Sequence, residues 1–168
     1  MEIVNRIIDF LINILAGIAA VIMGLLLIGI CYATFSRFVF NDPLARTVEL
    51  AAYSLIYITF LSAPWLLRQR GHINVDLILL ALKDRAQRAL LLFNDIIGVI
   101  ISSVFCYFSY LVTMSNIKED VRVMDSSNTP QWLLLFVIPI SFLFLAIQFL
   151  RFIREDIALL KEGKEGEL

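Results

Sequence analysis

The sequence is dominated by four long apolar runs that contain no charged residue. These runs are 27, 18, 22 and 25 residues long, at positions 10–36, 50–67, 96–117 and 126–150. A helix needs about 20 mainly apolar residues to cross the hydrocarbon layer of a bilayer. The runs therefore predict an all-α integral membrane protein with four transmembrane helices, at roughly residues 10–36, 46–67, 90–115 and 130–150.

The composition excludes a water-soluble domain. Hydrophobic residues make up 60% of the 168 residues, and the mean hydropathy is +0.86, whereas an ordinary soluble domain is about 45–50% apolar. The connections between the runs are too short for a further domain, so we predict a single membrane domain over residues 1–168. The first run is too long for a signal peptide and has no small-residue cleavage pattern, so we expect it to stay in the mature protein.

The lysines and arginines are unevenly distributed among the segments outside the runs. Ten lie in the N-terminal segment, the second connection and the C-terminal tail, and four lie in the first and third connections. Positively charged segments stay on the cytoplasmic side of a membrane. This bias predicts that both termini are cytoplasmic and that the first and third connections face outward.

The second connection contains an apolar segment that is too short to cross the membrane. Residues 73–82 would form about 15 Å of helix, half of what a crossing needs. Asn74 and Asp76 lie near its start, where a polar oxygen caps a helix and a negative charge suits the dipole. We predict a short interfacial helix at about residues 73–83, after the second span. We also expect the C-terminal tail to form an amphipathic extension.

The segment RGHINVD, at positions 70–76, contains the one histidine of the chain. A metal site needs three or four ligands, and His72 and Asp76 supply two at most. A catalytic or metal-binding role is therefore the less favoured alternative to a structural one, in which Gly71, His72 and Asp76 fix the turn into the interfacial helix. Cys31 and Cys106 lie within runs, where a disulfide or metal pair is not expected.

Small residues recur every four positions in two of the runs. Such stripes allow helix backbones to approach closely in lipid, where no hydrophobic force drives association. They serve either packing within the bundle, which we favour, or an interface with another chain. The stripes are Ala16, Ala20 and Gly24 in the first run, and Gly98, Ser102 and Cys106 in the third.

Strongly polar side chains are scarce within the runs and lie near their ends. Transporters that bind cargo within the membrane keep polar groups near the midplane, and the sequence shows none at that depth. Glu49 lies near the outer interface, where Arg37 or Arg46 is the candidate partner, and solvation at the surface is the alternative. These features predict no enzyme and no cofactor in this chain, and favour a protein that holds another one in place.

Four motifs in the first half of the chain resemble a known family. These motifs are Arg37-Phe38-Val39-Phe40, Glu49-Leu50-Ala51-Ala52-Tyr53, Phe60-Leu61 and Gly71-His72-Ile73-Asn74-Val75-Asp76. Their order and spacing are similar to those of the DctQ-type small membrane subunit of tripartite ATP-independent periplasmic (TRAP) transporters. The chain departs from the common pattern of that family around Glu49, at Thr47-Val48 and Leu44-Ala45, and at Ser62.

The resemblance implies a role as scaffold in the bacterial inner membrane. In such systems a periplasmic binding protein (P type) captures an organic anion, and a large multi-span subunit (M type) moves it together with sodium. The small subunit packs against the large one, so sodium and cargo are expected to bind the partner. Further expected partners are membrane lipids, and no nucleic acid is expected.

Two other functions stay open beside this one. A self-contained multidrug-type exporter would carry a membrane-embedded glutamate in its first span, where this chain has only Asn13 as a strongly polar side chain. A membrane anchor of an electron-transfer complex would need histidine pairs. The sequence leaves open whether the cargo is a dicarboxylate, a sialic acid, a sugar acid or another carboxylate, and which helices face the large subunit.

Overall fold

The computed structural model describes residues 2–40, 45–69, 84–123 and 128–165, which contain five helices. Together these helices provide four stretches that are long and apolar enough to cross a membrane, and the fourth stretch runs through α5 and α6. The prediction of an all-α membrane protein with four spans is therefore confirmed. The helices are α1 (Glu2–Phe40), α2 (Ala45–Arg68), α4 (Asp84–Lys118), α5 (Gln131–Leu135) and α6 (Val137–Glu165).

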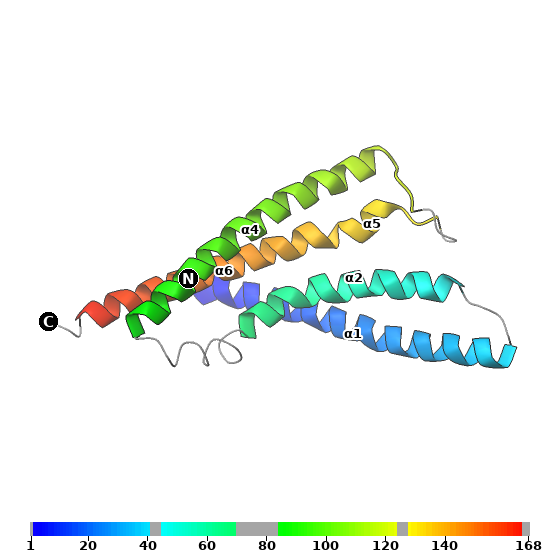
Figure 1. Ribbon diagram of the computed structural model, residues 1–168, viewed down its shortest axis with the longest axis horizontal. Coiled ribbons are helices and arrows are strands. Elements are labelled where there is room, and N and C mark those ends of the chain that lie inside the picture. The colour runs from blue at the N-terminus through cyan, green and yellow to red at the C-terminus, as the bar shows by residue number, and fades with distance from the viewer. Residues whose placement is uncertain (1, 41–44, 70–83, 124–127, 166–168) are drawn as a thin grey trace.

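The long helices pack in a row rather than in a closed bundle. Helix α1 packs on α2, α2 packs on α6, and α6 packs on α4. The pairs α1–α2 and α4–α6 lie close together at the end that carries both termini, and they diverge toward the opposite end (Figure 1). We call these two ends the termini end and the loop end.

A small cluster of buried apolar side chains lies where α1, α2 and α6 meet. Ala19, Leu61 and Val137 form this core, one from each helix, with partly buried side chains such as Ile56 and Ile138 packed around them. Large apolar side chains are exposed along every span. Because lipid tails are as apolar as leucine, exposed apolar surface is the expected exterior of a membrane bundle.

The helices run past the predicted spans at most of their ends. Helix α1 begins at Glu2 and α4 at Asp84, so both extend beyond the apolar runs into charged sequence. Helix α6 continues to Glu165, so most of the predicted C-terminal extension is a continuation of the last span. The predicted interfacial helix at 73–83 lies outside the described residues.

The last span is interrupted at Phe136, a feature absent from our sequence-based expectation of one continuous helix. Helix α5 ends at Leu135 and α6 begins at Val137. The cause is Pro139, because a proline ring clashes with the carbonyl four residues earlier, here that of Leu135, and offers it no N–H donor. The Phe136 N–H still makes the regular helical bond to the Trp132 carbonyl four residues earlier, at 3.0 Å.

The described ends of the connection from α4 to α5 are held together by backbone hydrogen bonds. The Val123 N–H donates to the Thr129 carbonyl at 2.9 Å, and the Gln131 N–H donates to the Val121 carbonyl at 3.0 Å. Asp120 and Asn128 adopt positive φ angles of 45° and 50°, a conformation that short polar side chains tolerate best after glycine. This arrangement fixes the position of Thr129, two residues before α5.

Candidate functional site

Three charged residues from three helices meet at the termini end. The Arg151 guanidinium of α6 donates to both carboxylate oxygens of Asp9 on α1, with Nη1–Oδ1 and Nη2–Oδ2 distances of 2.6 and 3.3 Å. Arg68 at the end of α2 places its Nη1 atom 3.7 Å from Asp9 Oδ1 and 3.4 Å from the Asp9 carbonyl oxygen. We call Asp9, Arg68 and Arg151 the inner clamp.

The inner clamp joins helices that are distant in sequence. The two-point Arg151–Asp9 contact is the geometry in which an arginine–carboxylate pair is both strong and directional. Arg151 Nη1 also lies 3.4 Å from Gln148 Oε1, one turn earlier on α6. The sequence predicted no site at these residues, and Arg68 and Arg151 contributed only to the predicted orientation. One signal could have predicted the clamp: each of the three residues directly adjoins an apolar run, at the end that the charge distribution places on the same side of the membrane.

A second polar contact joins α2 and α6 in the middle of the fold. Pro64 lacks an N–H, so the carbonyl of Phe60 one turn earlier loses its helical donor. The hydroxyl of Ser141 on α6 donates to this carbonyl at 2.5 Å, and Ser141 is only 1% exposed. The structure thereby satisfies a backbone group that the bilayer could not satisfy, and α2 remains helical through Pro64 to Arg68.

The Ser141 contact yields a coupled prediction. Ser141→Ala removes the donor to the Phe60 carbonyl and should lower the free energy of unfolding by about 1 kcal/mol, the size of a hydrogen bond between membrane helices. In a Pro64→Ala background the new N–H at position 64 donates to the Phe60 carbonyl. Ser141→Ala should then lower the free energy of unfolding by clearly less. A double-mutant cycle in detergent micelles measures this coupling, and equal costs in both backgrounds would contradict the assignment.

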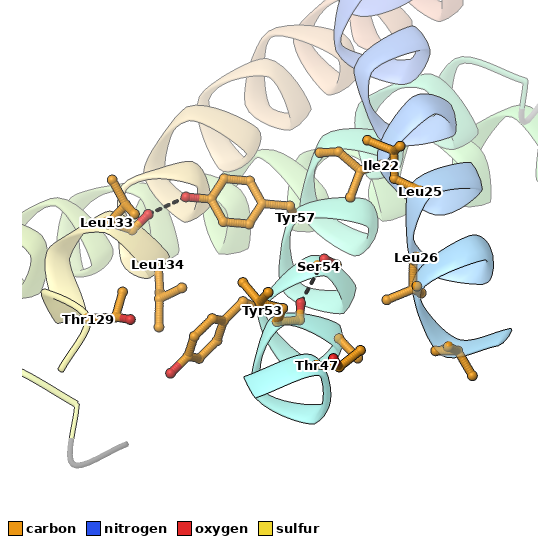
Figure 2. A pocket seen from close by; sticks show the side chains of 14 residues that line it. Ile22, Leu25, Leu26, Thr47, Tyr53, Ser54, Tyr57, Thr129, Leu133 and Leu134 are labelled. Carbon is orange, nitrogen blue, oxygen red and sulfur yellow. Dashed lines mark hydrogen bonds between the residues drawn. The ribbon is translucent and has the colours of Figure 1, made fainter. Parts of the chain in front are cut away.

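The tyrosine at position 57 ties α2 to the start of the last span. Its hydroxyl donates to the carbonyl of Leu133 on α5 (Figure 2). Its ring lies 6.1 Å from that of Phe136 in an edge-on arrangement. The interrupted segment is thus held by a side chain of α2, close to the point where the backbone changes from α5 to α6.

The two small-residue stripes lie in different environments. A Cβ atom on Gly98 of α4 would lie 2.6 Å from the Phe149 ring of α6, and Ser102, one turn along, is 3% exposed. The α4 stripe therefore lies against α6. On α1, Ala16 is half-buried and Ala20 and Gly24 are exposed, and no atom lies within 4 Å of the place where a Cβ on Gly24 would be.

The motif residues lie apart from the inner clamp. Arg37 is exposed in the last turn of α1, and Glu49 is half-buried near the start of α2, both toward the loop end. No ion pair joins these two residues, and Glu49 has another interaction partner. Gly71, His72 and Asp76 lie outside the described residues.

The remaining titratable groups do not form a metal centre within the described segments. In these segments no three histidine, cysteine, aspartate or glutamate side chains come together in a way that would hold a metal ion. Asp95 on α4 is 2% exposed and has an interaction partner. Cys31 and Cys106 are both free thiols, and the Cys106 thiol lies 3.4 Å from the Pro139 carbonyl.

The fold and these contacts define a multi-pass membrane protein in which several polar side chains join one helix to another. The family of tripartite ATP-independent periplasmic transporters, DctQ component, matches residues 26–159, well over half of the chain. The chain therefore belongs to the DctQ family and is the small membrane subunit of a TRAP transporter. No curated protein matches the chain at a significant level.

Proposed function

We propose that this subunit acts as the scaffold of a sodium-coupled, binding-protein-dependent transporter for organic anions. It carries no catalytic activity and no cofactor of its own. The large M-type subunit binds sodium and cargo, and the periplasmic P-type protein delivers the cargo. The family supports this division because it is a component of a three-part transporter.

The proposal rests on the observation that charged side chains within the fold already have interaction partners. Asp9, Arg68 and Arg151 are engaged with one another at the termini end, and the half-buried Glu49 and the buried Asp95 also have partners. A subunit that moves an anion needs charged or polar groups that exchange partners during transport. Charges that hold helices together suit a static scaffold.

The proposed location is the bacterial inner membrane with both termini in the cytoplasm. The ten-to-four distribution of basic residues supports this orientation. The inner clamp then lies near the cytoplasmic interface, and the diverging loop end lies near the periplasm. The two alternatives considered above, a self-contained exporter and an electron-transfer anchor, are not favoured by the family.

Co-purification with the large subunit tests the proposal. A tag on this chain should recover the large subunit from detergent-solubilised membranes in equal amounts.

We propose a structural role for the RGHINVD motif. His72→Ala and Asp76→Ala should each lower the recovered amount of the large subunit in part, because a lost helix cap or polar contact is worth roughly 1 kcal/mol. Neither variant should change the metal content of the complex.

The opposite pattern would refute the structural reading of the motif. An intact complex that has lost all transport activity together with a stoichiometric metal would assign His72 to a metal site. Failure of the wild-type chain to recover the large subunit would contradict the scaffold role itself. The Arg154→Ala variant, which changes an exposed side chain on α6, is the control for unspecific effects of losing one polar group.

A further inference from the structure

The inner clamp has more positive than negative charge. In it, the guanidinium groups of Arg68 and Arg151 share the carboxylate of Asp9. Arg6 on α1 and Arg154 on α6 lie three residues further from the apolar runs than Asp9 and Arg151, and both are exposed. Residues three apart are neighbours on one face of a helix, so these two arginines flank the clamp. We call Arg6, Arg68, Arg151 and Arg154 the arginine cluster.

The other carboxylates of the described helices at this end offset the excess only in part. Glu2 on α1 and Glu155 and Asp156 on α6 lie further from the apolar runs than the arginine cluster. Asp156 has an interaction partner, and so does the buried Asp95 of α4. Between the clamp and the next helical turn outward, α1, α2 and α6 therefore provide four guanidinium groups and one carboxylate.

The hydrogen-bond donors of the clamp also exceed its acceptors. Two guanidinium groups have ten N–H donors, whereas a carboxylate has about four acceptor positions. Among the described residues, Arg68 reaches Asp9 only through Nη1, at 3.7 Å from Oδ1 and 3.4 Å from the carbonyl oxygen, and its side chain is 31% exposed. The Arg151 Nε–H is buried and has no acceptor in the described part of the chain. The clamp can thus donate to a further group that carries oxygen acceptors.

The depth of the arginine cluster matches that of lipid phosphate groups. Asp9, Arg68 and Arg151 each directly adjoin an apolar run, so the clamp lies at the boundary of the hydrocarbon layer. The headgroup layer outside this boundary is roughly 5–7 Å thick on each side of a bilayer. Arg6 and Arg154 lie about 4.5 Å further out along their helices, which places them within that layer.

We propose that the arginine cluster binds the phosphate group of one anionic phospholipid from the leaflet at the termini end. The planar guanidinium fork of arginine matches phosphate oxygens in a two-point contact. The lipid is the source rather than free phosphate, because the cluster lies at the depth where the phosphates of a leaflet are concentrated. The excess positive charge selects an anionic lipid over a zwitterionic one, as basic pockets between membrane helices do in general.

Native mass spectrometry of the full-length chain in a mild detergent tests the proposal. The probes are phosphatidylglycerol and phosphatidylcholine with the same acyl chains, added in equal amounts, so that only the headgroup differs. We expect the first bound lipid to be phosphatidylglycerol, with a preference of roughly tenfold. A second arm adds millimolar inorganic phosphate, which should leave this preference unchanged.

Single substitutions locate the bound lipid. Arg6→Gln and Arg68→Gln should each lower the preference about fivefold, the factor for one arginine at an anionic membrane surface. Asp9→Asn should raise the preference, because the carboxylate repels a phosphate and competes for the same donors. Arg37→Gln is the matched control, since Arg37 is an exposed arginine at the loop end of α1, and it should leave the preference unchanged. Arg6 is exposed, so the Arg6 variant keeps the fold intact.

Three results would overturn the proposal. Equal binding of the two lipids would mean that the cluster does not select an anionic headgroup. Equal losses in Arg6→Gln and Arg37→Gln would mean that the preference reflects overall charge and not this cluster. Displacement of phosphatidylglycerol by inorganic phosphate would show that the cluster binds a free oxyanion. All three are measured on this chain alone, so they leave the scaffold function to its own test.

Discussion

Replacing Gly98 with leucine is expected to separate α4 from α6 and to lower the free energy of unfolding by about 3 kcal/mol. Even the first carbon of a side chain at this position would lie 2.6–2.7 Å from three atoms of the Phe149 ring. The ring cannot stay in place, and overpacking a close contact of this kind typically costs 1–3 kcal/mol. Because α4 contacts the remainder of the fold mainly through α6, the clash weakens the attachment of the whole of α4.

The measurement is unfolding of the purified chain by SDS in mixed micelles, followed by the fluorescence of Trp65 and Trp132. Gly17→Leu is the matched control, because a Cβ at Gly17 of α1 would have no atom within 4 Å. It should change stability by less than about 0.5 kcal/mol, as for most surface substitutions. A double variant with Phe149→Ala should recover part of the loss if the clash is its cause. Equal effects of the two leucine substitutions would contradict this account of the α4–α6 contact.

Replacing Asp9 with alanine is expected to loosen the termini end of all three helices that the inner clamp joins. The substitution leaves Arg68 and Arg151 without their shared carboxylate. Removal of one partner from a fully buried pair costs about 3–5 kcal/mol. Asp9 is 35% exposed at its side chain, so water compensates part of this cost, and we expect about 2 kcal/mol.

The same SDS titration measures this loss, with Glu155→Ala as control because Glu155 is an exposed carboxylate on α6. The exchange variant Asp9→Arg with Arg151→Asp restores opposite charges across α1 and α6. It should be more stable than either single substitution, since the pair and not one residue is what matters. If the exchange variant is no more stable than the single variants, the contact stabilises the fold through its specific geometry rather than through opposite charge. If Asp9→Ala and Glu155→Ala are alike, the clamp does not hold the helices.

The four spans were predictable because length and apolarity are properties of continuous sequence. Each of the first three runs lies inside one helix, at 10–36, 50–67 and 96–117. Most of the fourth run, at 126–150, lies in α5 and α6. The small stripe that includes Gly98 was visible from its four-residue spacing. Its contact with Phe149 was not, because spacing gives the face of a helix but not the helix that packs on it.

The contacts that join distant helices could not be derived from the sequence alone. Asp9 and Arg151 are 142 positions apart, and their pairing depends on how α1 and α6 are rotated about their axes. Ser141 serves the Phe60 carbonyl only because α6 crosses α2 next to Pro64. The interruption at Phe136 is different, because its cause, Pro139, lies within the last apolar run itself.

Uptake of organic anion by proteoliposomes tests the central claim, that this chain is a scaffold which moves nothing alone. Three samples are compared under an inward sodium gradient, with labelled anion and the binding protein outside: this chain alone, the large subunit alone, and both subunits together. We predict accumulation only with both subunits, and loss of that accumulation when the gradient is removed. Sodium-dependent accumulation in vesicles that contain this chain alone would contradict the account.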